Sequence, residues 1–225
     1  MRSRTVNTAC MGAALSLLLA GTAQAQDPRI EVGGSAGWTN SDGVTFDGVR
    51  AGDGNVYNGI EPKDSFSWSL NFGYFVNTNV EVGFLFDQQK STLQVTGSAV
   101  REIGDMSVNN YHGYFAYNFG DSDAPTRPFV LIGLGATNFG SIDATVAGVN
   151  RSIPGETQFS TTWAAGVKIF PSPHVGVRLA AEWTPTYIKT DSVGWWCDPY
   201  WGCYLVGDAQ YSNQWDIGGG ITFRF

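Results

Sequence analysis

The sequence is organised by an alternation of apolar and polar residues, which is clearest in its last eleven positions, residues 215–225. Every second residue counted back from the end is Phe, Phe, Ile, Gly, Ile and Trp, whereas the residues between them are small, polar or charged. A period of two places successive side chains on opposite faces of a β-strand. This segment therefore predicts a strand with one apolar face, bounded by an aromatic residue at each end.

The same alternation recurs seven more times, between segments rich in Gly, Asn, Asp and Pro. Such segments are typical of turns and loops, so the pattern predicts eight strands whose connections alternate between long and short. The predicted strands are residues 30–39, 66–74, 80–89, 111–119, 128–137, 159–169, 175–184 and 215–225. The four long connections are residues 40–64, 90–107, 138–157 and 185–211.

Every predicted strand has one face that lipid could cover and one that is small or polar, as in a transmembrane barrel. In this pattern and in its terminal Phe225, the chain resembles the outer-membrane β-barrel proteins of the small OmpA/opacity type. The resemblance implies an all-β fold: an eight-stranded antiparallel transmembrane up-and-down β-barrel with short periplasmic turns and four long extracellular loops. A soluble β-sandwich could show similar alternation, but it would not need lipid-like residues on one face of every strand.

The N-terminus predicts export. Arg2 and Arg4 precede an apolar segment at residues 9–20, and an Ala-Gln-Ala sequence at residues 23–25 follows it. These are the three parts of a secretory signal peptide, so we expect residues 1–25 to be cleaved and residues 26–225 to form the barrel domain. The apolar segment is too short for a membrane-spanning helix. Together with the resemblance, this implies location in a bacterial outer membrane.

Composition argues against nucleic-acid binding and against a transmembrane helix. The formal net charge is −7, and removal of the two arginines in residues 1–25 makes it −9. An acidic chain without a basic cluster is a poor nucleic-acid binder. The chain beyond residue 25 also contains no apolar run near twenty residues, so no transmembrane helix is expected there. Instead, glycine and aromatic residues are frequent and charge is low, as expected of lipid-facing strands joined by turns.

The apolar face contains two groups of residues to which we assign roles. Five tryptophans lie toward the long-loop ends of their strands, and Trp side chains collect at membrane–water boundaries. We therefore predict an aromatic girdle at that boundary. The resemblance implies that the last strand contains an assembly signal read by the barrel-assembly machinery. The girdle residues are Trp38, Trp68, Trp163, Trp183 and Trp215, and the signal residues are Ile221, Phe223 and Phe225.

The opposite faces of the strands place charged residues inside the barrel. Their functional interpretation is a polar pore or a proton path. Their structural interpretation is a buried network of ion pairs and hydrogen bonds, which the cost of unpaired buried charge favours. Eight strands enclose a space that side chains can fill. The inward charges are Glu31, Glu81, Asp87, Lys168, Arg178, Glu182, Asp216 and Arg224.

Catalytic and metal sites are not supported by the sequence. Some barrels of similar size modify lipid A, and a hydrolase would require Ser, His and an acid together near the outer leaflet. His112 is expected inside the barrel and His174 in a short turn, so no triad assembles. The Asp-rich segments at residues 53–55 and 121–123 lack the spaced ligands of a calcium loop. We expect no catalytic residue, no cofactor and no metal.

The last long connection contains an unusual aromatic segment, residues 195–204, with the sequence WWCDPYWGCY. Cys197 and Cys203 are the only cysteines after residue 25, and an exported protein passes through an oxidising compartment. With no histidine nearby for a zinc site, we predict a disulfide between them. This disulfide could simply staple an exposed hairpin, or it could hold a rigid aromatic surface for a partner.

These observations predict an integral outer-membrane barrel with a structural or surface-interaction role, in which the extracellular loops form the contact surface. The alternative is a narrow conduit for small or hydrophobic molecules, similar to the OmpW-type barrels. The expected partners are outer-membrane lipid and lipopolysaccharide, the barrel-assembly machinery, and an extracellular partner bound through residues 195–204. The two functions differ in the barrel interior, because a continuous water path or an apolar mouth would favour transport.

Overall fold

The structure is a computed structural model that describes residues 29–50, 54–146, 149–188, 195–198, 202–205 and 210–225. The predicted signal peptide, residues 1–25, lies outside the described residues. Within those residues the regular structure is entirely β-strand, and no helix is long and apolar enough to cross a membrane.

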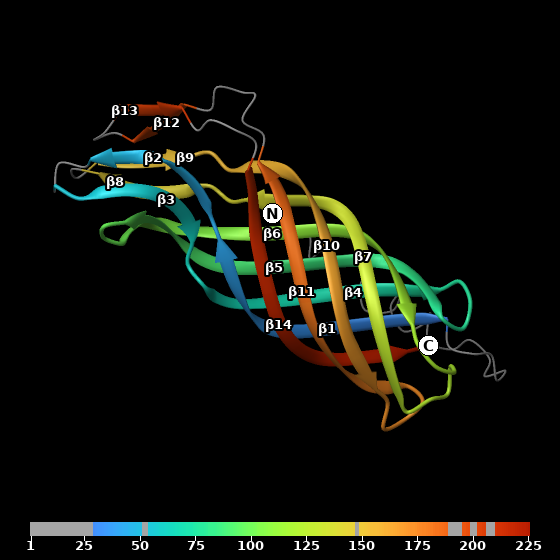
Figure 1. The fold of residues 1–225 in the computed structure, drawn as a ribbon. Helices are drawn as coiled ribbons and strands as arrows, with labels where there is room; N and C mark the ends of the chain where they lie inside the picture. Colours follow the sequence, from blue (N-terminus) through green and yellow to red (C-terminus); the bar gives the residue numbers. More distant parts are fainter. Residues whose placement is uncertain (1–28, 51–53, 147–148, 189–194, 199–201, 206–209) are drawn as a thin grey trace, which may run out of the picture.

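Eight strands form a closed antiparallel barrel (Figure 1). Barrel strands that follow one another along the chain pair side by side, including the three pairs that are separated by an inserted hairpin: β1 with β4, β7 with β10, and β11 with β14. Pairing of β1 with β14 joins the two ends of the chain, which closes the barrel. The eight strands are β1 (Ile30–Asp42), β4 (Ser65–Phe75), β5 (Val80–Gly97), β6 (Arg101–Asn118), β7 (Thr126–Phe139), β10 (Glu156–Ile169), β11 (Val175–Ile188) and β14 (Gln210–Arg224).

The predicted fold class is confirmed, and so is the assignment of faces in the barrel strands. Along β6, for example, Tyr111, Phe115 and Tyr117 are exposed on the outside, whereas His112 and Ala116 are buried inside. Because the side-chain period is two, a slip of one residue would have reversed these faces. The short turns gather at one end of the barrel and the long connections at the other.

The predicted long connections are wrong in one respect, because each contains strands. Residues 40–64 include β2 (Val44–Arg50) and β3 (Val56–Pro62), and β3 adds to the sheet beside β5. Residues 90–107 mostly belong to β5 and β6, which meet at a turn near residues 98–100. We call residues 90–97 of β5 and 101–107 of β6 the upper arms of these strands. The other two contain the hairpins β8 (Ile142–Val146) with β9 (Val149–Ile153), and β12 (Trp195–Asp198) with β13 (Gly202–Leu205).

A second small core explains why the segment at residues 90–107 is ordered as strand. Leu93, Met106, Val108 and Ile142 are buried against one another above the barrel. Partly buried apolar residues from β3, β6 and β7 pack around them. The alternation of the barrel therefore continues past the membrane, because a buried apolar face exists there as well.

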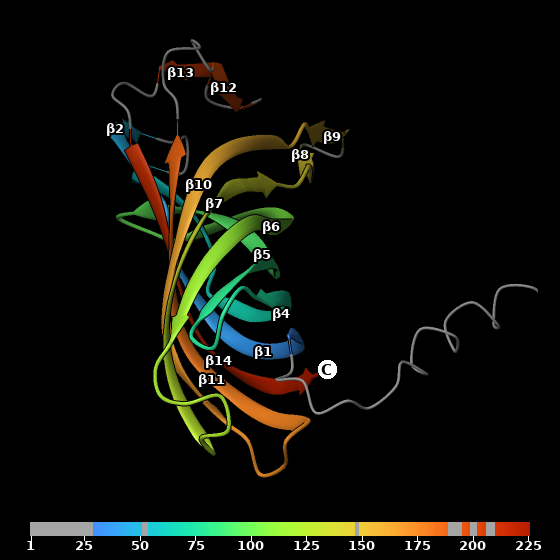
Figure 2. The same cartoon turned by 90° about the vertical axis from the view of Figure 1, so that its right-hand side faces the viewer.

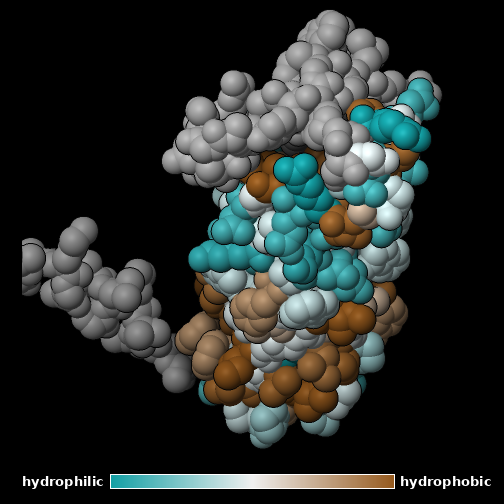
Figure 3. Space-filling model, turned by 90° about the vertical axis from the view of Figure 1, so that its left-hand side faces the viewer, coloured by the Kyte–Doolittle hydropathy of each residue, from teal (hydrophilic) through white to brown (hydrophobic). Residues whose placement is uncertain are grey.

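The outer wall carries a broad hydrophobic band next to the short-turn end, and hydrophilic residues lie above it toward the long-loop end (Figure 3). The large apolar side chains of this wall are unusually exposed; Leu134 is 62% and Ile217 is 73% accessible. Exposed apolar surface of this extent marks a surface that another apolar medium covers. Viewed from the side, the hairpins of the long connections all lie beyond one end of the barrel (Figure 2).

Candidate functional site: the barrel interior

The interior begins, near the short-turn end, with a buried ionic cluster. Lys168 Nζ lies 2.6 Å from Glu31 Oε1 and 2.8 Å from Glu81 Oε2. Arg224 Nε lies 3.2 Å from Glu31 Oε2. These four side chains come from β10, β1, β5 and β14, so the cluster ties together strands from around the whole barrel. All four are almost completely buried.

Further hydrogen bonds satisfy the carboxylate at the centre of this cluster. The Tyr114 hydroxyl donates to Glu81 Oε1 at 2.6 Å, and Asn118 Nδ2 donates to Glu81 Oε2 at 3.0 Å. Two glycines make room for these groups, because a Cβ at Gly73 would collide with the Glu81 carboxylate and one at Gly83 with the Tyr114 ring. A buried ion pair is tolerated best when its remaining hydrogen-bonding capacity is also met, as it is for the Glu81 carboxylate.

An apolar layer fills the middle of the barrel. Leu85, Phe129 and Leu131 are at most 5% accessible and pack together across the interior. The Phe129 ring also receives two cations on its faces: Lys168 Nζ lies 5.3 Å and Arg178 Cζ lies 4.8 Å from the ring centroid. Arg178 makes no salt bridge with any carboxylate of the described chain. Its charge is instead accommodated by the aromatic ring.

Hydrogen-bonded polar side chains fill the part of the barrel nearer the long-loop end. Gln89 and Gln214 are bonded to each other at 3.1 Å, and Asn110 bridges Gln214 to Asp87, with 3.1 Å on each side. Thr137, Ser160 and Thr186 extend this network along the opposite wall. The layer is held by hydrogen bonds from neutral donors, unlike the ionic layer below it.

The predicted opposition of inward charges therefore holds for only part of the set. Glu31 and Glu81 meet Lys168, and Glu31 also meets Arg224, but Asp87, Glu182 and Asp216 form no salt bridge in the described structure. They accept hydrogen bonds from neutral donors instead. Glu182 binds the Thr162 hydroxyl, Asp216 binds the hydroxyls of Thr39 and Ser67, and Asp87 binds Asn110.

Side chains of all three layers are buried. Large side chains from every layer are inaccessible to solvent, including Glu31, Gln89 and His112 at 0%. An eight-stranded barrel is just narrow enough for side chains to fill it. This arrangement fits the structural interpretation of the inward charges.

The interior also brings a serine and a histidine together. His112 Nε2 lies 2.9 Å from Ser160 Oγ, but His112 Nδ1 has no hydrogen-bond partner among the described residues. An acid on Nδ1 is what orients the base of a catalytic triad. Both side chains are also buried, at 0% and 1% accessibility, so no substrate could reach them. His174 lies in the β10–β11 turn, where Nδ1 contacts the Arg224 carbonyl at 3.2 Å.

Within the described residues, no group of three or more His, Cys, Asp or Glu side chains is placed to hold a metal ion.

Sequence reasoning missed one buried cation, Arg127, which is 2% accessible at the short-turn end of β7. The predicted strand begins one residue later, so it does not include Arg127. The signal was present, because Arg127 shares the inward parity of Phe129 and Leu131. Extending the alternation by one step would have placed it inside the barrel.

The predicted girdle tryptophans lie on the outer wall. Trp163, Trp183 and Trp215 are direct neighbours across β10, β11 and β14, and the rings of Trp183 and Trp215 stack with their centroids 5.5 Å apart. Trp38 is 55% and Trp68 is 36% accessible. Trp68 continues the line of aromatic rings through Phe86 to Tyr111, and neighbouring centroids lie 5.3 and 5.1 Å apart.

The assembly-signal residues and the cysteines lie at opposite ends of the barrel. Ile221, Phe223 and Phe225 are 53%, 43% and 58% accessible on the outer face of β14 and its end. The backbone register places Cys197 directly opposite Cys203 in the β12–β13 hairpin. Residues 199–201 of the predicted aromatic segment lie outside the described residues.

The chain matches the family model of the outer membrane protein beta-barrel domain over residues 11–225. It therefore belongs to this family, and it is an integral β-barrel protein of the bacterial outer membrane. The short-turn end of such barrels faces the periplasm and the long-loop end faces the exterior. A search of curated proteins finds no match to the chain.

Solved structures of outer-membrane proteins share this fold. OprG from Pseudomonas aeruginosa has a TM-score of 0.62 at 14% identity, with 89% of this chain and 97% of that chain covered. Neisserial surface protein A has a TM-score of 0.53 at 15% identity, with coverages of 87% and 97%. AlkL, determined in lipid bilayers, has a TM-score of 0.53 at 11% identity, with coverages of 91% and 94%. At these identities, the likeness supports the fold alone.

Proposed function

We propose that this barrel acts through its extracellular surface, as a structural and surface-interaction protein with a closed interior. The observation that carries the proposal is the continuation of the barrel sheet beyond the membrane. A transmembrane β-strand needs about 9–11 residues. The strands β5 and β6 each have 18 residues, so a large part of each lies outside the bilayer.

This extension has a fold of its own. It joins β2, β3 and the upper arms of β5 and β6 in one sheet above the second core. Lys63 and Glu102 form a salt bridge of 2.8 Å between the β3–β4 connection and β6, and this hydrogen-bonded pairing raises the pKa of Lys63. A surface that is already ordered loses less conformational entropy when it binds a partner. The extension is therefore suited to contact.

The β12–β13 hairpin adds a second contact element to the proposal. Opposite residues in an antiparallel pair have Cα atoms about 4.5–5.5 Å apart, within the range that a disulfide spans. The register of Cys197 and Cys203 supports the proposed disulfide between them. The aromatic segment at residues 195–204 would then be presented on a constrained hairpin to an extracellular partner, or to lipopolysaccharide around the barrel. No catalytic step is part of this proposal.

The filled interior separates this function from the conduit alternative. Conductance of the purified barrel in a planar lipid bilayer tests the difference directly. We expect no stepwise opening from the native chain, because the apolar layer of Phe129 and Leu131 blocks the path. The positive control is the double variant Phe129→Ala with Leu131→Ala, which removes both side chains and should conduct more. Stable single-channel steps from the native barrel would instead support transport.

Attachment is the second arm of the test. Cells that display the native barrel are compared with cells that display a variant in which a Gly-Ser linker of equal length replaces residues 195–204. Adhesion to glycan-coated and to uncoated polystyrene is counted at equal surface expression. We expect the replacement to reduce adhesion. Equal adhesion by both strains, and by cells without the barrel, would contradict the surface-interaction role.

A further inference from the structure

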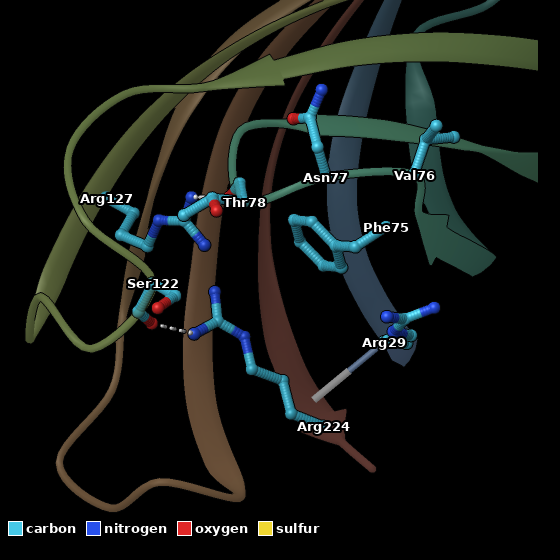
Figure 4. Close-up of a pocket in the computed structure, with 8 residues that line it drawn as sticks. All are labelled: Arg29, Phe75, Val76, Asn77, Thr78, Ser122, Arg127 and Arg224. Atoms are coloured by element: carbon cyan, nitrogen blue, oxygen red, sulfur yellow. Dashed lines mark hydrogen bonds between the residues drawn. The ribbon is translucent and has the colours of Figure 1, made fainter. Parts of the chain in front are cut away.

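The periplasmic mouth of the barrel contains a pocket of about 190 Å³ (Figure 4). Its walls come from the start of β1, the β4–β5 turn, the β6–β7 turn and the ends of β7 and β14. One water needs only about 10–15 Å³ of such space, so the pocket is large enough for a small solute. Three arginines and no carboxylate line it. The lining residues are Arg29, Phe75, Val76, Asn77, Thr78, Ser122, Arg127 and Arg224.

Two of the arginines are held in place by the turns. Arg127 Nη2 donates to the Thr78 carbonyl at 2.6 Å, and Arg224 Nη1 donates to the Ser122 carbonyl at 3.3 Å. Aromatic rings also contact the guanidinium groups. Arg127 Cζ lies 5.6 Å from the Phe75 ring centroid, and Arg224 Cζ lies 3.3 Å from that of Phe170. These contacts fix the positions of the two guanidinium groups before any ligand arrives.

Each of these guanidinium groups retains a buried nitrogen without a partner. Arg127 Nε and Arg224 Nη2 make no hydrogen bond within the described structure, although the residues are only 2% and 3% accessible. Buried donors are nearly always paired in folded proteins, and an unpaired one on a charged group is costly. Both residues line the same pocket, so a ligand inside it could lie against both guanidinium groups.

The charge at the mouth selects the sign of that ligand. Among the described residues, Glu31 is the one carboxylate side chain that forms a salt bridge with these arginines, and it is shared with Lys168. Asp121 lies in the adjoining β6–β7 turn but is exposed and outside the pocket lining. Positive charge on the lining is therefore in excess, which excludes a metal cation and favours an anion.

We propose that this pocket is a binding site for a phosphate group. A planar guanidinium presents its donors as a fork that matches the oxygen spacing of phosphate, and two such forks from different strands suit a tetrahedral oxyanion. The phosphate can come from inorganic phosphate or a phosphate monoester in the periplasm, or from the headgroup of a lipid in the inner leaflet. The site lies at the end of the barrel opposite the proposed contact surface, and it is independent of that role.

Titration calorimetry of the full barrel in a maltoside detergent, which has no phosphate of its own, tests the proposal. Inorganic phosphate, glycerol 3-phosphate and a short-chain phosphatidylglycerol are titrated separately at constant ionic strength, and succinate serves as a dicarboxylate comparison. We expect saturable binding of one phosphate per barrel. Binding of the first two ligands indicates a soluble source, and binding of the lipid alone indicates a headgroup.

Two variants locate the binding. Arg127→Gln should weaken phosphate affinity about tenfold or more, because a charge-assisted contact is lost. Thr78→Glu places a carboxylate at the exposed rim of the pocket without altering the buried network, and it should abolish binding even if Arg127→Gln fails to fold. Lys63→Gln is the matched control, because it removes one positive charge at the extracellular end and should leave affinity unchanged.

The proposal is overturned by any of three results. These are the absence of saturable binding for all three phosphates, a preference for succinate over phosphate, and an affinity that Thr78→Glu leaves unaltered or that Lys63→Gln reduces equally. Native folding of each variant is established first by its gel migration before and after boiling.

Discussion

At the scale of single residues, the buried charges determine how the interior can be built. Lys168 is 2% accessible and contacts two carboxylates that are themselves buried. Replacing a complete buried ion pair with apolar groups is often neutral, but removing one partner leaves the others uncompensated. The barrel therefore depends on Lys168 more than on either acid alone.

We expect Lys168→Met to lower the free energy of unfolding by about 3–5 kcal/mol, because Glu31 and Glu81 lose their common counter-charge. Adding Glu81→Gln to this variant should recover part of the loss by removing one uncompensated charge. Urea titration of the barrel, followed by the fraction that keeps the folded gel mobility, measures both changes. Lys63→Met, at an exposed salt bridge, is the control and should change little. Equal effects of Lys168→Met and Lys63→Met would show that the cluster is not structural.

Which residues face inward could be predicted from the alternation, but their partners could not. Glu31, Glu81 and Lys168 meet because β10 lies across the barrel from β1 and β5, and this depends on the register and closure of the sheet. The alternation also could not predict that Asp87 and Asp216 accept hydrogen bonds from neutral donors. The pocket proposed to bind phosphate could not be predicted from the sequence either, because its walls come from turns far apart in the chain.

At the scale of elements, the strands are longer than hydrophobicity alone indicated. The upper arms of β5 and β6 carry polar residues on both faces at several positions, so they resembled a loop. They form strands because Leu93 and Met106 enter the second core, which other segments of the chain complete. A contact between distant segments thus overrides the local composition, as it commonly does for strands.

The β12–β13 hairpin is expected to depend on a disulfide between Cys197 and Cys203. The chain-entropy contribution for so small a loop is about 2–3 kcal/mol, which would order the hairpin without affecting the barrel. Thiol titration of the folded protein should find no free thiol before reduction. Reduction should increase protease cleavage between about residues 190 and 207 and leave gel migration unchanged. Two reactive thiols without reductant would contradict the disulfide, and an unchanged cleavage pattern would remove its ordering role.

The terminal strand should govern assembly. The outward residues Ile221, Phe223 and Phe225 form an exposed apolar edge, and Phe225 N donates to the Ile30 carbonyl at 2.9 Å where the barrel closes. We expect deletion of Phe225, or Phe225→Asp, to prevent accumulation in the outer membrane. Phe119→Asp is the control, because it alters an exposed aromatic residue at the same end but outside this strand. Fractionation of cell envelopes distinguishes the two, and normal insertion of the truncated chain would contradict the signal.

At the scale of the whole molecule, closure of the sheet and the hydrophobic band act together. In the bilayer core, every backbone N–H and C=O must be paired within the protein, and a closed barrel achieves this without free edges. Pairing of β1 with both β4 and β14 completes the ring. The hydrophobic band then sets the depth of the barrel in the bilayer, because lipid must cover the exposed apolar side chains and end at the aromatic girdle.

The position of the bilayer on the barrel can be tested with arginine at two depths of β11. Leu179 lies four residues from the periplasmic end of the strand, and Trp183 lies four residues further, in the proposed girdle. A lipid-facing Arg costs about 2–4 kcal/mol at the midplane and about 0–1 kcal/mol near the interface. We therefore expect Leu179→Arg to be the more destabilising of the two, relative to alanine at the same site.

The alanine reference is essential at Trp183, because this residue also stacks on Trp215 and donates a hydrogen bond of 3.1 Å to Asn213. Subtracting the effect of Trp183→Ala removes these losses and leaves only the cost of placing the charge. The same subtraction at Leu179 uses Leu179→Ala. Unfolding of the four variants in urea and lipid vesicles gives the two differences. If they are equal, or if Trp183 gives the larger one, the outer boundary of the bilayer does not lie at the tryptophan girdle.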